Sequence, residues 1–230
     1  MTNDLDQIVM AKAQAWLDGD YDEATKAQVK YLIDNDKNEL VESFYKDLEF
    51  GTGGLRGIMG VGSNRMNIYT VRKATQGLAN YIVKQGFAAK GVAIAYDSRR
   101  MSPEFANEAA LCLAANGIKA YVFESLRPTP ELSFAVRELK CIAGINITAS
   151  HNPAEYNGYK AYWADGAQVT PPHDTGIMEC VNKVTNFSSP KMMDKEEAIQ
   201  KGLFISIGED VDEAYMAEVA KQVKEPEIVK

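Results

Sequence analysis

Residues 148–153, TASHNP, place a serine beside a histidine directly after the apolar run CIAGINI. A turn uses small, polar and ring-locked residues, so Ser150 can be a cap or a turn residue. It can also be a nucleophile, but a hydrolase elbow reads GxSxG, which this segment does not. A catalytic triad would need a base on another element, and His173 is the only histidine besides His151. The residues alone leave the role of Ser150 open.

Two other polar segments could bind an anion. Residues 51–57, GTGGLRG, combine glycines, which let backbone N–H groups approach an anion, with the forked guanidinium of Arg56. A flexible linker explains the same composition, and no GK[ST] follows to complete a Walker A loop. Residues 96–99, YDSR, end an apolar run, where Asp97 can also form a local Asx-turn.

Residues 18–22, DGDYD, offer three carboxylates that could bind Mg²⁺ or Ca²⁺. The glycine and glutamate that complete an EF-hand loop do not follow at the required places. Gly19 as a helix end and Asp20 or Asp22 as a helix cap explain the segment without a metal. We therefore predict a boundary between two helices here.

The elements that must position these side chains fall into two groups. The first 48 residues predict an amphipathic helical arm, with apolar residues at helical spacing and a third helix after Asp36, where Glu39 completes a capping box. From residue 91 onward, short apolar runs alternate with helical patterns. The expected strands are 91–96, 119–125, 141–147 and 203–207; the expected helices include 70–85, 103–117, 130–140 and 174–185, and 156–170 is an expected antiparallel hairpin.

Two of these helices have clear predicted starts: Ser102 caps and Pro103 opens one, and Thr129 caps and Pro130 opens the next. The alternation predicts an α/β fold, a three-layer α/β/α sandwich with a mixed, partly parallel sheet, preceded by the N-terminal helical arm.

In open α/β sheets, ligands bind outside the carboxyl ends of the strands. YDSR and TASHNP both follow strands at such ends. We therefore expect Asp97, Arg99, Ser150 and His151 on one rim of the sheet.

Composition limits the function further. The chain has 230 residues, a formal net charge of −7 and a sequence pI of about 5.0. This acidic balance, without a Lys/Arg cluster, argues against a nucleic-acid partner. Three widely spaced cysteines, Cys112, Cys141 and Cys180, favour reduced core thiols in a cytoplasmic protein. We expect no membrane partner, because no stretch approaches the roughly 18 apolar residues of a span.

Together the motifs resemble the α-D-phosphohexomutase family, which includes phosphoglucomutase and phosphomannomutase. TASHNP resembles the family's active-site serine signature, GTGGLRG its N-terminal glycine-rich loop, and YDSR its (R/Y)DSR segment. NGYK, residues 157–160, resembles the (N/D)xGxK that follows the serine. The four segments occur in the family's order, and the helical arm is similar to that of the larger phosphoglucomutase/phosphopentomutase-like subgroup.

The resemblance implies a role for each matching residue. Ser150 would carry a phosphoryl group, donate it to a sugar monophosphate and recover the other phosphate from the bisphosphate intermediate, with Mg²⁺ as cofactor bound through the phosphate on Ser150. Lys160 would stabilise charge or transfer a proton, and Arg56 and His151 would contact phosphoryl or sugar oxygens. Asp97 and Arg99 would support the site. Arg99 is also grouped with Thr148 and Asn152 as an expected substrate- or phosphate-binding residue.

The chain also departs from the family pattern. The family's metal loop, DxDxDR, follows the serine in a second domain, and no such loop occurs here. We therefore expect an N-terminal fragment: a helical arm over 1–48, the phosphoserine domain over 49–190, and a linker with the start of the next domain over 191–230.

The expected reaction interconverts a sugar 1-phosphate and 6-phosphate, with glucose or mannose as the sugar. The fragment alone is expected to be inactive, and the remaining domains of the enzyme are its expected partners. Two alternatives stay open: a phosphopentomutase of the same family, and a non-catalytic domain that binds an anion or a protein partner.

Overall fold

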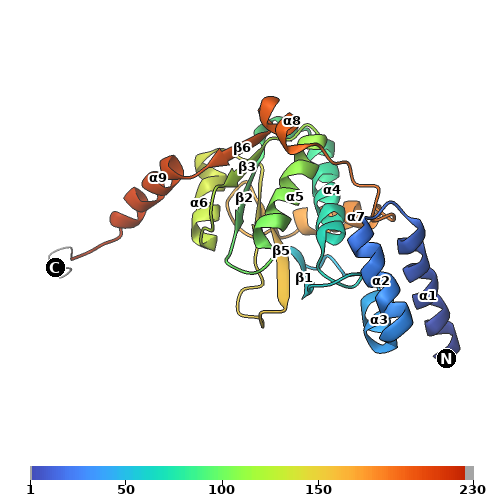
Figure 1. Ribbon diagram of the computed structural model, residues 1–230. Helices are drawn as coiled ribbons and strands as arrows, with labels where there is room; N and C mark the ends of the chain where they lie inside the picture. The colour runs from blue at the N-terminus through green and yellow to red at the C-terminus, as the bar shows by residue number, and fades with distance from the viewer. Residues whose placement is uncertain (1, 226–230) are drawn as a thin grey trace.

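The computed structural model describes residues 2–225 of the chain. The helices are α1 (Thr2–Asp18), α2 (Glu23–Asn35), α3 (Lys37–Phe44), α4 (Ile68–Lys84), α5 (Ser102–Ala115), α6 (Thr129–Glu138), α7 (His173–Asn182), α8 (Lys195–Gln200) and α9 (Glu209–Ala220), with a 3₁₀ turn at Ala88–Lys90. The strands are β1 (Gly54–Ile58), β2 (Val92–Tyr96), β3 (Ala120–Phe123), β4 (Ala143–Ile147), β5 (Tyr156–Trp163) and β6 (Phe204–Ile207). Figure 1 shows α1–α3 and α9 at opposite ends of the molecule.

The arm formed by α1–α3 packs around Trp16, whose ring stacks on Tyr21 with centroids 4.5 Å apart. Asp22 caps α2 by accepting the backbone N–H of Thr25, so the predicted helix boundary in DGDYD is confirmed. Asp36 likewise caps α3, but the carboxylate of Glu39 does not complete the expected capping box. It binds the guanidinium of Arg65 instead, because that buried charge needs a partner.

The six strands form one mixed sheet in the order β1-β5-β4-β2-β3-β6. β4, β2, β3 and β6 run parallel, whereas β5 lies antiparallel between β4 and β1. This arrangement confirms the expected mixed, partly parallel sheet. The carboxyl ends of β2 and β4 therefore meet at one edge, from which the segments YDSR and TASHNP leave.

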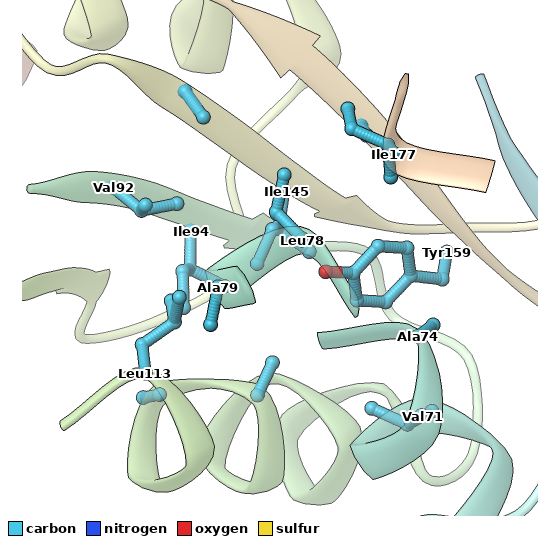
Figure 2. Packing of buried hydrophobic residues seen from close by; sticks show 14 of the residues in the cluster. Val71, Ala74, Leu78, Ala79, Val92, Ile94, Leu113, Ile145, Tyr159 and Ile177 are labelled. Carbon is cyan, nitrogen blue, oxygen red and sulfur yellow. The ribbon is translucent and has the colours of Figure 1, made fainter. Parts of the chain in front are cut away.

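Helices cover both faces of the sheet, which completes the three layers. One face packs against α4, α5 and α7, and the larger cluster of buried apolar residues lies there. Figure 2 shows Leu78 of α4, Ile94 and Ile145 of the sheet, and Tyr159 of β5 in this cluster. The other face packs against α6. The sheet is thus buried on both sides, and side chains reach solvent mainly where strands end.

The two expected helix caps were wrong. Ser102 and Thr129 are not caps: each is the first residue of its helix, with Met101 and Pro128 before it. Their hydroxyls form hydrogen bonds with other side chains: Ser102 donates to Asp97, and Thr129 accepts from Asn146.

The glycine-rich segment 51–57 is not a loop throughout, because β1 begins at Gly54 and pairs with β5. In the expected hairpin over 156–170, β5 continues into a turn and a single antiparallel bridge joins Tyr162 to Gln168.

No helix of the described chain is both long and apolar enough to span a membrane. Cys112, Cys141 and Cys180 are buried free thiols, as expected. The boundaries between segments at residues 48 and 190 stay a prediction. Residues 226–230, at the end of the expected third segment, lie outside the described residues.

Candidate active site

The TASHNP loop leaves β4 with an exposed serine in an uncommon backbone conformation. Ser150 has a φ of 57°, in the left-handed region that non-glycine residues rarely occupy. Its backbone N–H donates to the hydroxyl oxygen of Thr148 at 3.0 Å, and the N–H of Asn152 donates to the carbonyl of Ala149 at 3.1 Å. These two hydrogen bonds join residues that are close in sequence, so they fold the loop into a tight turn. The Ser150 side chain is exposed at this turn.

A second polar segment, YDSR, lies directly beside this loop. Arg99 donates through Nη2 to the carbonyls of Ser150 at 3.0 Å and Asn152 at 2.6 Å. It donates through Nη1 to the carbonyls of Pro153 at 2.8 Å and Tyr156 at 3.0 Å. The sequence expectation that the two segments share a rim agrees with these contacts, since residues about 50 positions apart are joined.

Arg56 and Lys160 project from the same face of the sheet. In the β1–β5 pair, Leu55 lies opposite Tyr159, and both are buried on the α4 side. Because side chains alternate along a strand, Arg56, which lies opposite Gly158, and Lys160 point to the other face. Arg56 reaches the TASHNP loop, where its Nη1 donates to Asn152 Oδ1 at 2.8 Å. Arg56 thus contacts the serine loop, and Lys160 lies on the same face of the sheet.

Glycine at position 158 allows this close approach. A Cβ on Gly158 would lie 2.6 Å from the carbonyl oxygen of Thr148 and 3.2 Å from that of Leu55. The first distance is too short for a carbon atom and the second is tight, so any side chain would push β5 away from the start of the serine loop. This requirement explains the glycine of NGYK in physical terms.

The two histidines lie in different environments. His151 is exposed, and its Nδ1 is 3.3 Å from Ser150 Oγ, a long contact for a proton-transfer pair. His173 begins α7, stacks on Trp163 with ring centroids 4.3 Å apart and pairs with the Tyr81 hydroxyl at 2.9 Å. Neither imidazole has a carboxylate partner within residues 2–225. The geometry therefore gives a hydrolase triad no support.

A metal ion would find few ligands in the described residues. Among residues 2–225, no three His, Cys, Asp or Glu side chains gather where they could hold a cation. In DGDYD, Asp22 is used by Thr25 and by the Tyr69 hydroxyl. The donor set present here therefore does not by itself fit a Mg²⁺ site.

Two features of the site could not be read from the sequence. Asn157 and Ser102 are fully buried and hydrogen-bonded to each other at 3.0 Å, although they lie 55 positions apart. Glu131 is buried at the start of α6, where its Oε1 lies 3.8 Å from Arg127 Nε but has no hydrogen-bond partner in the described part of the chain. The NGYK motif contained Asn157, but no local signal pointed to its bond with Ser102 or to the burial of Glu131.

Comparisons with known proteins agree with this architecture. Residues 47–188 match the family model described as phosphoglucomutase/phosphomannomutase, alpha/beta/alpha domain I. A phosphopentomutase of Homo sapiens is 44% identical over 177 residues, which are 73% of this chain and 29% of that protein. A phosphoglucomutase of Staphylococcus haemolyticus is 39% identical over 182 residues, 79% of this chain and 33% of that protein.

A crystal structure of a phosphoglucomutase/phosphomannomutase family protein from Burkholderia thailandensis has a TM-score of 0.57. It covers 76% of this chain and 36% of that chain at 23% identity, which establishes a likeness of fold. The chain thus spans about a third of the length of the proteins that it matches.

Proposed function

The chain belongs to the phosphoglucomutase/phosphomannomutase family through its α/β/α domain I, and from this we propose that Ser150 carries the transferred phosphoryl group of a sugar-phosphate mutase. One observation carries the proposal. Ser150 is exposed at the carboxyl end of β4, in a left-handed turn, with Arg56 beside its loop. A serine that only ended a strand would need neither the strained backbone nor the adjacent positive charge.

In the proposed reaction the phosphoserine ester bond breaks as an oxygen–phosphorus bond forms to a hydroxyl of a sugar monophosphate. The hydroxyl loses its proton, and Ser150 Oγ regains one. The bisphosphate then returns its other phosphoryl group to Ser150 by the reverse step, so the enzyme ends as it began. Phosphoryl transfer needs positioning and positive charge around three oxygens more than covalent chemistry.

Each side chain around Ser150 has a role in this proposal. Arg56 and Lys160 neutralise charge on the transferred group, and His151 contacts a phosphoryl or sugar oxygen. Thr148 and Asn152 shape the loop, a role supported by their hydrogen bonds to Ser150 and Arg56. A Mg²⁺ ion would supply further charge neutralisation. We propose that one of its ligands is an oxygen of the phosphate on Ser150 and that the others lie outside residues 2–225.

The sugar is a second part of the proposal. We propose glucose or mannose phosphates, interconverted between the 1-phosphate and the 6-phosphate. A pentose phosphate is the alternative, and the similarity to a protein named phosphopentomutase, at 44% identity, favours it over this stretch. Similarity to a protein named phosphoglucomutase, at 39%, is nearly as high, so the sugar needs a direct test.

We also propose that the described chain requires the rest of the enzyme for turnover, because it spans about a third of its relatives. Its buried free thiols fit a reducing cytoplasm. Conversion of glucose 1-phosphate by the purified 230-residue chain with Mg²⁺ would overturn the proposed inactivity.

Intact-mass measurement tests the phosphoryl carrier directly. After incubation with a hexose 1,6-bisphosphate, the chain is expected to gain about 80 Da, the mass of one phosphoryl group. Peptide mapping should place this mass on Ser150, and Ser150→Ala should not gain it. Phosphorylation at another residue would contradict the proposal. Binding of the bisphosphate without transfer would favour the non-catalytic anion-binding domain, and labelling of Ser150 by a fluorophosphonate would favour a hydrolase.

A further inference from the structure

The guanidinium of Arg99 is engaged mainly by the chain itself. A guanidinium has five N–H donors in a fixed fork. Nη1 and Nη2 each donate to two carbonyls of the TASHNP loop and its continuation, which uses four of the five donors. Nε forms an ion pair with Asp97, 3.4 Å from its Oδ2. Direct contact of Nη1 or Nη2 with a phosphate would therefore break existing hydrogen bonds.

A buried relay holds Arg99 in place. Asp97 accepts the backbone N–H of Arg99 at 3.0 Å and the hydroxyl of Ser102 at 2.8 Å on the same carboxylate oxygen. The amide of Asn157 donates to Ser102 Oγ at 3.0 Å and to the carbonyl of Arg100 at 3.0 Å. Ser102 and Asn157 are fully buried, so water does not compete for these bonds. The relay therefore fixes the guanidinium relative to β5 and α5.

The clamp orients the peptide planes of the loop. In a trans peptide the N–H of one residue points opposite to the preceding carbonyl. Because the carbonyl of Ser150 points at Arg99, the N–H of His151 points away from it, and no acceptor for this N–H lies within residues 2–225. The same contacts offset the cost of the left-handed backbone of Ser150, a conformation that is unfavourable for a residue with a Cβ.

We infer that Arg99 is a positioning residue, held by Asp97, Ser102 and Asn157, that keeps the Ser150 loop in its transfer-competent shape and does not itself bind the phosphoryl group. The catalytic consequence rests on the proposed function of Ser150, whereas the effect on the loop does not. A phosphate ligand and a carbonyl clamp make different demands on the side chain. Lysine retains the charge that attracts phosphate, but it cannot reproduce a planar fork to four carbonyls.

The first measurement is hydrogen exchange of the backbone amides in the 230-residue chain. The amides of Ser150, Asn152 and Tyr156 are all hydrogen-bonded within the loop. In Arg99→Lys we expect them to exchange at least tenfold faster, while amides of β2 and β4 keep their rates. Arg100→Lys, at the exposed neighbouring arginine, is the matched control and should leave all of them unchanged. Loop exchange within twofold of the wild type in folded Arg99→Lys overturns the inference.

Ser102→Ala provides a second variant in case Arg99→Lys fails to fold. It keeps Arg99 but removes the hydroxyl between Asn157 and Asp97. We expect exchange in the loop to rise at least threefold. Unchanged exchange rates of the loop amides in Ser102→Ala would show that Ser102 and Asn157 do not help to hold Arg99.

The second measurement is the rate of phosphorylation of Ser150 by a hexose 1,6-bisphosphate, followed by intact mass. A positioning role predicts at least a tenfold slower rate in Arg99→Lys, with little change in the rate for Arg100→Lys. A direct phosphate ligand predicts a slower rate in Arg99→Lys with loop exchange unchanged from the wild type, and that result would overturn the inference. If the wild type takes up no phosphoryl group, the expectation that this chain can be phosphorylated without the rest of the enzyme fails, and the exchange measurement still decides whether Arg99 holds the loop.

Discussion

The hydroxyl oxygen of Thr148 accepts the backbone N–H of Ser150 at 3.0 Å, so a buried residue at the start of the loop fixes the exposed residue two positions later. Thr148 is 7% exposed, whereas Ser150 is open to solvent. The hydrogen bond therefore anchors an exposed, strained residue to the packed end of the sheet. Its removal provides a direct test of how far the loop conformation depends on local contacts.

Thr148→Val keeps the shape of the side chain but removes the acceptor. We expect a loss of about 1 kcal/mol in the free energy of unfolding, because the N–H of Ser150 loses its partner. Phosphorylation of Ser150 should slow several-fold. Thr148→Ser retains the hydroxyl and is the matched control, expected to keep the rate near that of the wild type. Urea unfolding and intact mass measure the two effects, and an equal rate in Val and Ser variants would contradict the expectation.

Gly158→Ala should destabilise the sheet beside the serine loop. The added Cβ would lie 2.6 Å from the carbonyl oxygen of Thr148, and both atoms belong to a packed β-sheet. We expect a loss of about 1–3 kcal/mol, the usual cost of overpacking, measured by urea unfolding.

Gly60→Ala is the control, since its Cβ would make only an ordinary van der Waals contact with the Arg65 side chain, at 3.5 Å. It should change the stability by less than about 1 kcal/mol. Equal stability of the two variants would show that β5 can move without cost.

Lys160→Met removes the ammonium but keeps the length and the apolar stem of the side chain. If this charge stabilises the transferred phosphoryl group, phosphorylation of Ser150 by a hexose 1,6-bisphosphate should slow by about 10²–10³. The free energy of unfolding should change little, because Lys160 is only half-buried. Lys84→Met, on the exposed surface of α4, controls for the loss of one positive charge. A common, small effect in both variants would show that only net charge matters.

The buried carboxyl of Glu131 predicts a pH-dependent stability. Burial raises the pKa of Glu131 to about 7, and the neighbouring Asp212 acts in the same direction, against the opposing charge of Arg127. In the unfolded chain a glutamate has a pKa of about 4.3. Folding thus favours the protonated form. The stabilisation is complete below the unfolded pKa and is lost as the pH rises through the folded value of about 7.

Glu131→Gln cannot ionise, so its stability should fall less between pH 5 and pH 8. We expect the free energy of unfolding of the variant, relative to that of the wild type, to be higher at pH 8 than at pH 5 by on the order of 1 kcal/mol. Urea unfolding at several pH values measures this difference. Glu138→Gln, at an exposed site on the same helix, should show the same dependence of stability on pH as the wild type. If stability depended on pH in the same way in both variants and in the wild type, Glu131 would be excluded as the cause of the pH dependence.

The sequence by itself determined the class of fold, the order of most elements and the segments that form the site. Apolar runs and helical patterns are local signals, so β2, β3 and β4 were expected close to where they occur. The motif TASHNP identified Ser150, and its place after a strand put it on the same rim as Arg99, because parallel strands end together.

Only the tertiary structure decided what the polar side chains contact. Ser102 has the local sequence of a helix cap, yet its hydroxyl donates to the half-buried Asp97 and accepts from Asn157, which lies 55 positions away. The strand β1 depends on pairing with β5, a contact about 100 residues away that no local pattern encodes. The sequence places Arg99 both among the residues that support the site and among the expected phosphate ligands. In the structure its Nη1 and Nη2 donate to backbone carbonyls that the fold brings within 3.0 Å. Asn157, β5 and these carbonyls lie far along the chain from their partners, so the contacts are fixed only when the sheet forms.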